Sequence, residues 1–528
     1  MLNHKIKSCA LLLLALAFAN YASAAPLSLP DALGTVAQEQ SLAEILSSAR
    51  KAAKREAWAA TAAGIQLSGQ SDAGYVDAQF SLTFGKQGQY RYTNQGALAQ
   101  TVCFDGSTAS LRQRFGPAIT IEQEERDMWN LLQWIHSGFW CESAAEIQLR
   151  LQGSETRYIR LEVSFSSSNL VGQLLLDPET FLPARLERTT TGSTDVTTFE
   201  NYQLVAGIPM AHLVTSAGKG SSSRLVVENG QAASSDPVTP YTLPSGPGAD
   251  TTFDSQVDAE VELRRVRTGH LIVQPLIEGK NMGWFILDSG AGIMCIDPKV
   301  ANSLDLPKFG SVPAIGVSGQ ITANYRQGTH FELGPLQMQD PLYIELDLAF
   351  LEAHFGVKIA GICGYEFFAR SVLELDLKEN QLAIYDPESY TLADGTWSEL
   401  QVINSIPCLT CRFEGDRSGI FKLDLGDAST ISFFTPAVEE LNLLEGRKVT
   451  PTQTGGVGGS GTASAGTVDW FEVGGHRTNN LPVVFSHTKV GVFSSTYALG
   501  NLGSKMLEPF RITFDYRHKR ICLQPREL

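Results

Sequence analysis

Features that mark several common functional classes are missing from this 528-residue sequence. It has no long basic run, and its 56 Asp and Glu residues outnumber its 41 Lys and Arg residues, for a net charge of −15. Nucleic acid is not expected as a partner, because binding to phosphates requires clustered Lys and Arg. The nine His residues show no metal-ligand spacing. We therefore expect neither a metal nor another cofactor.

Long apolar runs are also scarce. The run Ala10–Ala19 is too short to span a membrane, and no later segment is long and apolar enough. This run follows Lys5 and Lys7 and precedes Ala22-Ser23-Ala24, which is the pattern of a secretory signal and its cleavage site. We expect residues 1–24 to be a signal peptide. The mature protein would then be exported, periplasmic or secreted, without an integral membrane segment.

Cysteine is sparse, with eight residues in the chain and seven after residue 24. Export permits disulfides, and Cys103 and Cys141 could form one. Cys408 and Cys411 form a CxxC pattern, but a redox motif of this type needs the start of a helix, and this segment is expected to be a strand. A second CxxC pair for zinc is missing. We expect these two cysteines to be buried or bridged.

The most informative stretch is Trp284–Ala291, in which an apolar run ends on a carboxylate. Phe285–Leu287 has the composition of a buried strand, and Asp288 follows it directly. Gly290 permits a sharp turn after the acid, because glycine adopts backbone conformations that other residues avoid. Asp-Ser-Gly alone is equally typical of a surface turn, so its interpretation depends on the rest of the chain.

The same layout occurs twice. In each copy an aspartate precedes a glycine by 76 or 79 positions, and that glycine precedes a second aspartate, at the end of a strand-like alternation, by 12. These anchors, first copy then second, are Asp288 and Asp424, Gly364 and Gly503, and Asp376 and Asp515. We expect Asp376 and Asp515 to be structural, bonding backbone N–H groups in a turn.

Two further elements lie between the anchors of each copy. One is a Gly-rich hairpin candidate, Gly316-Val317-Ser318-Gly319 or Gly456-Val457-Gly458-Gly459. The other is a Phe-Glu-aliphatic-Gly element, at 331–334 or 471–474. Agreement of several anchors in order and spacing indicates an internal duplication. The second Gly-rich stretch also fits GxGxxG, but no strand-to-helix step surrounds it, so a nucleotide site is not expected.

Each copy resembles one lobe of the retropepsin-like, pepsin-clan aspartic peptidases. The resemblance implies two tandem β-barrel lobes, at 255–398 and 399–528, with one catalytic aspartate from each lobe at the seam. In this sequence these aspartates are Asp288 and Asp424. The two acids would share a proton and activate a water, which hydrolyses a peptide bond without a covalent intermediate.

The resemblance also implies roles for neighbouring residues. Ser289, Gly290 and Gly426 would support the dyad, and flexible hairpins would fold over an extended polypeptide substrate and pair with it as an added strand. The expected flaps are residues 316–325 and 455–466, with the substrate-binding residues Gly316, Val317, Gly319, Gly456, Val457 and Gly459. The family fold also brings Cys295 and Cys363 near each other, which permits a disulfide.

The second copy departs from the Asp-Ser/Thr-Gly pattern at Leu425 and Asp427. In the family the hydroxyl after the acid hydrogen-bonds across the seam, which Ser289 can do and Leu425 cannot. A half-lost network could misplace the dyad, and small misplacements are costly in catalysis. Asp427 would raise the proton affinity of the dyad if it points toward the two acids, or else find a cation or solvent. An alternative is therefore a non-catalytic peptide-binding or scaffold protein with a degenerate second lobe.

Residues 25–228 have another pattern, and the Gly-, Pro- and Ser-rich stretch 229–254 is expected to be a linker. Residues 42–61 read as a helix with Ser41 as N-cap and Glu44 three residues on, and residues 121–137 read as a second helix. Short alternating segments indicate one antiparallel sheet. They are 80–84, 89–92, 149–151, 158–163, 173–176, 185–188 and 197–204.

This N-terminal α+β domain resembles, in its strands and turns, the half-barrel of periplasmic lipoprotein carriers. A lipid or lipoprotein carrier is therefore a third hypothesis, beside a packed accessory domain. The whole chain is expected to be mostly β, an antiparallel sheet domain followed by two retropepsin-like lobes. The leading hypothesis is an exported aspartic endopeptidase.

Overall fold

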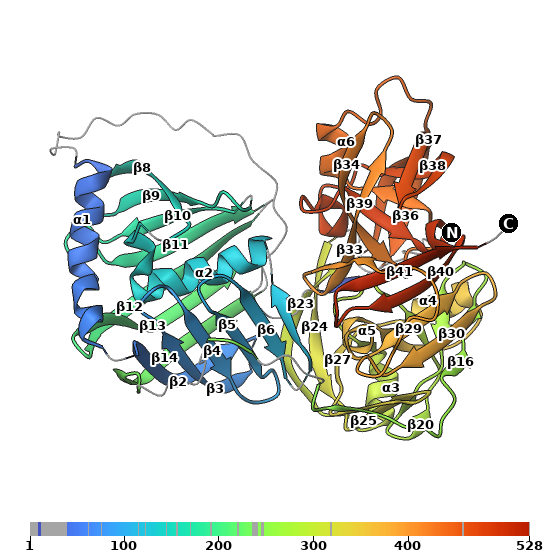
Figure 1. The fold of residues 1–528 in the computed structure, drawn as a ribbon, viewed down its shortest axis with the longest axis horizontal. Helices are drawn as coiled ribbons and strands as arrows, with labels where there is room; N and C mark the ends of the chain where they lie inside the picture. Colours follow the sequence, from blue (N-terminus) through green and yellow to red (C-terminus); the bar gives the residue numbers. More distant parts are fainter. Residues whose placement is uncertain are drawn as a thin grey trace, which may run out of the picture. The chain divides into compact units, whose positions relative to one another are not determined.

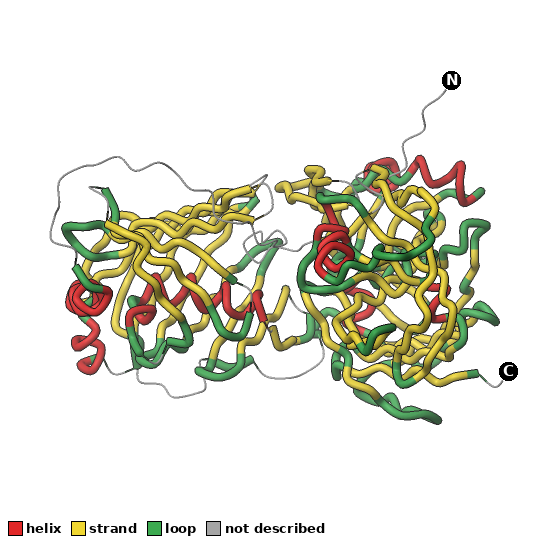
Figure 2. Tube along the Cα trace, turned by 90° about the horizontal axis from the view of Figure 1, so that it is seen from above, coloured by secondary structure: helices red, strands yellow, loops and turns green. Residues whose placement is uncertain are grey.

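The computed structural model describes residues 9–11 and 40–526, apart from short gaps at 62, 75, 115, 122, 144, 155–156, 169, 191–192, 219–220, 235–240, 244–247, 317–318 and 457–458. Val317, Val457 and most of the expected signal segment 1–24 lie outside the described residues. The chain separates into two compact units, formed largely by residues 23–245 and 246–528. Strands dominate both units (Figure 2), which confirms the expectation of a mostly β protein.

The N-terminal unit is built on one 13-stranded sheet in which every neighbouring pair is antiparallel. Its order is β7-β6-β5-β4-β3-β2-β14-β13-β12-β11-β10-β9-β8. The strands are β2 (Ile65–Ala73), β3 (Asp77–Phe84), β4 (Tyr90–Asn94), β5 (Gln100–Phe104), β6 (Ala109–Gln113), β7 (Ala118–Ile121), β8 (Gln148–Ser154), β9 (Ile159–Ser164), β10 (Val171–Leu176), β11 (Pro183–Thr190), β12 (Ser193–Val205), β13 (Ile208–Gly218) and β14 (Ser221–Ala232).

Helix α2 (Gln123–Ser137) lies across one face of this sheet (Figure 1) and fills it with aromatic side chains. Trp129 packs against Tyr92 of β4 with ring centroids 5.8 Å apart, and Trp134 packs against Phe104 of β5 at 5.9 Å. Both tryptophans are 2% exposed. Burial of such large rings stabilises the unit by about 1.5–3 kcal/mol each, and it makes α2 part of a packed core.

The helix expected at 42–61 is divided into α1 (Leu42–Ala52) and the 3₁₀ helix η1 (Arg55–Ala60). Ser41 and Glu44 form the expected capping box, but Lys54 adopts a left-handed conformation with φ of 46° and ends the helix. Tertiary contacts outweigh helix propensity here. The break directs Trp58 into the core at 2% exposure, while the Arg55 guanidinium donates to Glu142 and to two backbone carbonyls.

Two of the sheets in the C-terminal unit share one strand order. The order β18-β21-β28-β22-β27-β24-β23 in the first lobe matches β33-β34-β39-β35-β38-β37-β36 in the second. The first set is β18 (Leu271–Val273), β21 (Trp284–Leu287), β22 (Cys295–Ile296), β23 (Lys308–Gly316), β24 (Gly319–Gln327), β27 (Leu342–Glu345) and β28 (Ile359–Cys363). The second is β33 (Ile406–Phe413), β34 (Arg417–Asp424), β35 (Ile431–Phe433), β36 (Thr450–Gly456), β37 (Gly459–Val473), β38 (His476–Ser486) and β39 (Gly500–Gly503).

Both lobes contribute to a six-stranded sheet of order β16-β30-β29-β40-β41-β31. Its central pair joins β29 (Val372–Asp376) of the first lobe to β40 (Phe510–Asp515) of the second, antiparallel, with Val372 opposite Asp515. The other strands are β16 (Glu260–Glu262), β30 (Gln381–Tyr385), β31 (Ser398–Glu399) and β41 (Arg520–Pro525). The lobes are therefore parts of one hydrogen-bonded body.

Smaller elements complete the unit. Short strands are β1 (Cys9–Leu11), which pairs with β23, and β15 (Thr251–Phe253), β17 (Arg264–Arg265), β19 (Leu276–Ile277), β20 (Lys280–Asn281), β25 (His330–Leu333), β26 (Leu336–Gln339) and β32 (Gln401–Ile403). Helices are α3 (Pro298–Ser303), α4 (Ala349–Phe355), α5 (Tyr365–Arg370), α6 (Thr435–Glu440), α7 (Ser504–Leu507) and the 3₁₀ turn η3 (Gly491–Ser494), with η2 (Phe139–Cys141) in the N-terminal unit.

Both ends of the expected linker 229–254 are strands. Strand β14 continues to Ala232, which pairs with Ile65 of β2. Strand β15 pairs with β26, and the preceding Asp250 forms an ion pair with Arg370 at 2.7 Å. The Gly, Pro and Ser content of this segment indicates a break between domains. Its first and last residues nevertheless form strands, because pairing with β2 or β26 satisfies their backbone groups.

The repeat anchors form equivalent core contacts. Phe285 and Phe331 meet edge-to-face in the first lobe, with ring centroids 6.5 Å apart. Their counterparts Phe421 and Phe471 meet edge-to-face in the second lobe at 5.0 Å. All four rings are fully buried. The duplication is therefore preserved at positions where aromatic packing stabilises each barrel.

Candidate active site

The two aspartates lie at equivalent strand ends. Asp288 directly follows β21, which runs parallel to β28, and its backbone N–H donates to the Cys363 carbonyl at 3.0 Å. Asp424 is the last residue of β34, which runs parallel to β39, and it pairs with Gly503. In each lobe, parallel pairing of two non-consecutive strands therefore holds the acid at the start of a tight turn.

The structure brings the two acids together at the seam, each against the glycine of the opposite lobe. A Cβ atom at Gly426 would lie 2.5 Å from Cγ and Oδ1 of Asp288, and one at Gly290 would overlap the Asp424 carboxyl group. The two carboxyl groups are in hydrogen-bond contact with each other. Glycine is required at both positions because any side chain would displace a carboxylate.

Ser289 connects the lobes with one hydroxyl group. Its Oγ donates to the Leu423 carbonyl at 2.8 Å and accepts from the Leu425 N–H at 3.0 Å. Leu425 is fully buried but has no polar side-chain atom with which to return these bonds. The hydrogen bonds from Ser289 of the first lobe to the second lobe are therefore present, whereas the corresponding bonds from position 425 to the first lobe are missing.

The protonation of the dyad follows from burial and proximity. Burial raises the pKa of Asp288 to about 6, against the opposing effect of the Gly290 N–H, which donates to Oδ1 at 2.8 Å. Burial also raises the pKa of Asp424 well above its usual value, and the charges of Asp288 and Asp427 raise it further, against the charge of Lys422. Two carboxylates in contact cannot ionise independently, so the pair retains one proton through mildly acidic pH.

Asp427 is held within its own lobe. It accepts from the Ser429 N–H at 2.8 Å and from the Ser432 hydroxyl at 3.1 Å. Its charge acts on the dyad through Asp424, and also on His270 of the first lobe, whose pKa is lowered by burial and partly restored by Asp427. The third acid thus contributes an electrostatic effect at the seam.

Asn501 is a site residue that the sequence analysis missed. It is buried on β39, and its Nδ2 donates to Oδ2 of Asp424 at 2.8 Å. The equivalent position in the first lobe is Ile362, which has no hydrogen-bonding group. Comparison of Gly361-Ile362-Cys363-Gly364 with Gly500-Asn501-Leu502-Gly503 would have identified this polar substitution.

The Gly-rich segments form the expected hairpins, with longer arms than expected. Gly316 pairs with Gly319 at the neck of the β23–β24 hairpin, and Gly456 pairs with Gly459 at the neck of the β36–β37 hairpin. Each strand pair extends well before the glycines, to Lys308 in the first lobe. The expected stretches 316–325 and 455–466 therefore cover mainly the second strand of each hairpin. The first strands, β23 and β36, were not recognised because their sequences lack a distinctive pattern.

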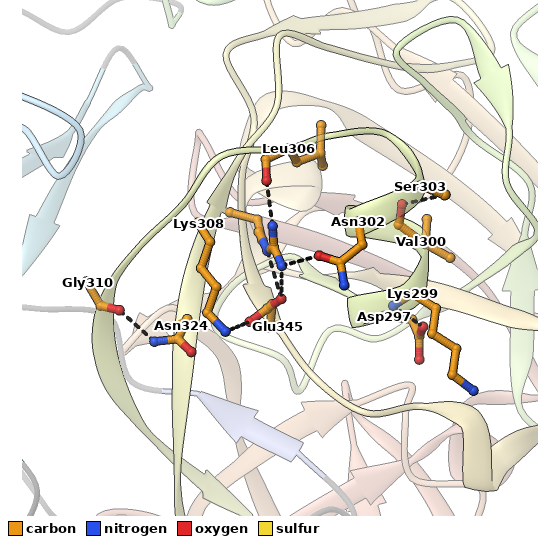
Figure 3. Close-up of polar contacts among 11 residues, drawn as sticks. Asp297, Lys299, Val300, Asn302, Ser303, Leu306, Lys308, Gly310, Asn324 and Glu345 are labelled. Atoms are coloured by element: carbon orange, nitrogen blue, oxygen red, sulfur yellow. Dashed lines mark hydrogen bonds and ion pairs between the residues drawn. The ribbon is translucent and has the colours of Figure 1, made fainter.

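Arg326 fixes the base of the first hairpin, and Figure 3 labels its partners Glu345, Leu306 and Asn302. Its guanidinium donates to Glu345 Oε1 at 2.7 Å, to the Leu306 carbonyl at 2.6 Å and to Asn302 Oδ1 at 2.6 Å. Lys308 of β23 reaches Glu345 at 3.0 Å. Such charge-assisted bonds hold the base of the hairpin firmly. In the second lobe Arg447 binds Glu414 and the Thr467 carbonyl of β37.

Asp376 and Asp515 do lie in turns. Asp376 accepts from the N–H groups of Lys378 and Glu379 at 3.1 and 2.9 Å, and Asp515 accepts from the His518 N–H at 3.1 Å. Arg511 and Arg520 add ion pairs to these two acids. These bonds agree with the structural role predicted for them.

The two disulfides that the sequence permits are not formed, and the expectation that Cys408 and Cys411 are buried or bridged is met by burial. Cys103, Cys141, Cys295 and Cys363 are buried and free, although Cys295 and Cys363 lie on paired strands. Cys408 and Cys411 are free and buried on β33. Burial raises the pKa of Cys408 to about 12, and that of Cys411 also rises, so neither forms the thiolate that redox exchange requires.

In the described part of the chain, no group of three or more His, Cys, Asp or Glu side chains is arranged to hold a metal ion. No described helix is long and apolar enough to cross a membrane.

The comparison with protein families agrees with the resemblance of the first lobe. Residues 273–367 match the family described as aspartyl protease. A retropepsin-like aspartic protease from Rickettsia conorii is 16% identical, with a TM-score of 0.19, and the match covers 26% of this chain and 100% of that one. A LolA superfamily protein from Nitrosomonas europaea is 13% identical, with a TM-score of 0.29, covering 38% of this chain and 97% of that one. No curated protein matches this sequence.

Proposed function

We propose that this protein is an exported aspartic endopeptidase in which Asp288 and Asp424 act as one dyad. The observation that carries the proposal is the reciprocal packing at the seam, where each carboxyl group lies against the glycine of the opposite lobe. This arrangement has no purpose in packing two barrels, because buried carboxylates in contact are unfavourable. It is the arrangement that water activation requires.

The mechanism follows from the shared proton. The ionised carboxylate accepts a proton from a water held between the two acids, and the water oxygen attacks the peptide carbonyl carbon. The protonated carboxyl group donates to the developing oxyanion, and a proton then passes to the leaving nitrogen. The N–H groups of Gly290 and Gly426 hold the ionised form, and the Ser289 bonds fix the distance between the lobes.

The polypeptide substrate would bind extended, between the dyad and the β23–β24 and β36–β37 hairpins. Strand β36 is the last strand of its sheet and offers backbone groups for such pairing, whereas β23 pairs with β1 in this structure. The polar contacts of Arg326 and Arg447 anchor the bases of the two hairpins.

Cleavage of a denatured protein mixture from pH 3 to 8, followed by mass spectrometry, tests the proposal. We expect wild-type activity that is greatest on the acidic side, is blocked by a pepstatin-type inhibitor, and falls by about a thousandfold or more in both Asp288→Asn and Asp424→Asn. Asp305→Asn is the matched control, because this exposed aspartate lies in the first lobe away from the seam. Unchanged cleavage in either dyad variant would contradict the proposal.

A peptide-binding scaffold is a second candidate, favoured by the absent hydroxyl at Leu425. It predicts that extended peptides bind equally well to the wild type, Asp288→Asn and Asp424→Asn, with no cleavage by any of them. Fluorescence anisotropy with labelled peptides, measured beside the cleavage assay, separates the two functions.

A further inference from the structure

Lys422 is a buried cation on the same face of β34 as the catalytic Asp424. Alternate residues of a strand point to the same side, so Lys422 and Asp424 share one face while Phe421 and Leu423 share the other. Phe421 and Leu423 are fully buried, and Phe421 packs in the aromatic core of the second lobe. Lys422 therefore lies on the face that carries the dyad.

The ammonium group of Lys422 rests against two aromatic rings. Its Nζ lies 4.6 Å from the ring centroid of Tyr497 and 5.0 Å from that of Phe434, and the residue is 7% exposed. An ammonium group has three N–H donors. Within the described part of the chain, no hydrogen bond or ion pair to a protein oxygen satisfies them. The nearby thiol of Cys408 stays neutral, so it does not compensate the charge.

The charge of Asp424 acts on Lys422, but no carboxylate of the described residues is hydrogen-bonded to its ammonium group. A buried lysine in this state is unfavourable, since cation–π contacts recover only part of the lost hydration. Burial lowers the pKa of Lys422 to about 8, so the group remains charged in acidic and neutral solution. A carboxylate arriving with a ligand would remove this cost.

The surroundings of Lys422 connect it to the region where a peptide would bind. Phe434 belongs to a cluster with Phe493 and Ala498, against which Tyr497 packs. Phe493 lies in η3, and η3 lies against β23 and β24 of the first lobe's hairpin. The aromatic cluster around Lys422 thus extends to the hairpin of the opposite lobe.

The first lobe provides the contrast. Ile286 occupies the position of Lys422, two residues before the aspartate, and its side chain is buried and apolar. The two equivalent positions that flank the dyad therefore differ in charge. A peptide lying across the dyad would meet an apolar side chain on one side and a cation on the other.

We infer that Lys422 is a specificity-determining residue that binds a carboxylate of the substrate, an Asp or Glu side chain next to the scissile bond, on one side of that bond. This inference rests on the proposed function. A charge-assisted hydrogen bond to the ammonium group discriminates Glu from Gln by about tenfold or more. The C-terminal carboxylate of a peptide has the same chemistry as an Asp or Glu side chain, and the experiment below distinguishes the two.

The test uses fluorogenic peptides that differ at one residue, Glu, Gln or Leu, at each position flanking the mapped cleavage site, with free or amidated C-termini. For the wild type we expect kcat/KM to be about tenfold or more higher for Glu than for Gln on one side only. In Lys422→Met the ratio falls to about 1, whereas Ile286→Met, the matched change in the first lobe, retains it. Dependence on the free C-terminus instead of Glu assigns the site to a terminal carboxylate and contradicts the side-chain assignment.

Two results would overturn the inference. One is a wild-type Glu-to-Gln ratio near 1, and the other is an unchanged ratio in Lys422→Met. Thermal melting of Lys422→Met checks that the variant folds. If the wild type cleaves nothing, the proposed function fails, and binding of the same peptides to full-length Asp288→Asn decides the inference separately. It stands if Glu peptides bind more tightly than Gln peptides and Lys422→Met in that background removes the difference, and it fails otherwise.

Discussion

The two lobes share one strand order but carry different residues at the seam between them. Four pairs of equivalent positions differ in kind. At three of them the first lobe has an apolar residue and the second a polar or charged one, and at the fourth the first lobe has the bridging hydroxyl and the second an apolar residue. These pairs, first lobe then second, are Ile286 and Lys422, Ser289 and Leu425, Ala291 and Asp427, and Ile362 and Asn501. Three of the four second-lobe residues are polar groups that act on Asp424.

This difference shows how a duplicated fold can specialise without changing its topology. The first lobe supplies the hydroxyl that crosses between the lobes next to the dyad, through Ser289. The second lobe supplies Lys422, Asp427 and Asn501, which set the charge around Asp424. The first lobe therefore provides the hydrogen bonds that hold the lobes together beside the dyad, and the second provides the groups that shift the pKa of Asp424. The following substitutions test this difference between the lobes.

The largest effect is expected where the lobes are still equivalent. Gly426→Ala would place a methyl group 2.5 Å from the Asp288 carboxyl carbon, so the acid must move and activity should fall by about a thousandfold. Gly290→Ala should do the same to Asp424. Gly446→Ala is the control, since an added methyl there meets no described atom within 4 Å although φ is +67°. Peptide cleavage rates measure the effect, and near-normal rates in the two seam variants would show that the contact is not needed.

The next effect concerns the one-sided coupling through Ser289. Ser289→Ala leaves the Leu423 carbonyl and the Leu425 N–H without their partner, at about 1–3 kcal/mol of stability. We expect kcat to fall by about tenfold to a hundredfold, with KM little changed, because the dyad loses its alignment. Ser371→Ala is the control, since its buried hydroxyl bonds within the first lobe. Equal losses in both variants would mean that Ser289 stabilises the fold without aligning the acids.

The pH dependence of stability should depend on the buried dyad. Because the folded-state pKa of Asp288 is raised to about 6, its contribution is complete below the unfolded value and is lost as pH rises through 6. Asp288→Asn should therefore be more stable than the wild type at pH 8, by about 1–3 kcal/mol, and should lose this advantage at pH 3.5. Thermal melting across this range measures it, with Asp305→Asn as the exposed control. A constant difference at all pH values would rule out titration as its cause.

The smallest effect should come from making the second lobe resemble the first. Asn501→Ile removes the hydrogen bond to Asp424 Oδ2, which favours the ionised form of that acid. The alkaline limb of the pH–activity profile should then move upward by about half a unit. Ile362→Val in the first lobe removes no hydrogen bond and should leave the limb in place. A downward shift in Asn501→Ile would mean that Asn501 stabilises the protonated acid.

Much of this architecture could be predicted, because repeated spacing shows where equivalent strands end. Asp288 and Asp424 were identified from an apolar strand followed by a turn, a pattern that local physical chemistry explains. Asn501 and Lys422 were missed as site residues, since each lies within a strand segment whose partners are distant in sequence. The break at Lys54 was missed for the same reason, because contacts made by Arg55 and Trp58 outweigh helix propensity.

Sequence pattern alone establishes the duplication, the positions of the two acids, the glycines that permit their turns, and the missing hydroxyl at Leu425. These are properties of local pattern and backbone freedom, which do not depend on distant contacts. Tertiary structure alone decided which groups surround Asp424, that Ser289 serves both lobes, that the cysteines are free, and that Lys422 is buried against aromatic rings. Burial and charge in a folded interior are set by residues far apart in the chain, so the pKa of each acid emerges only when the lobes pack together.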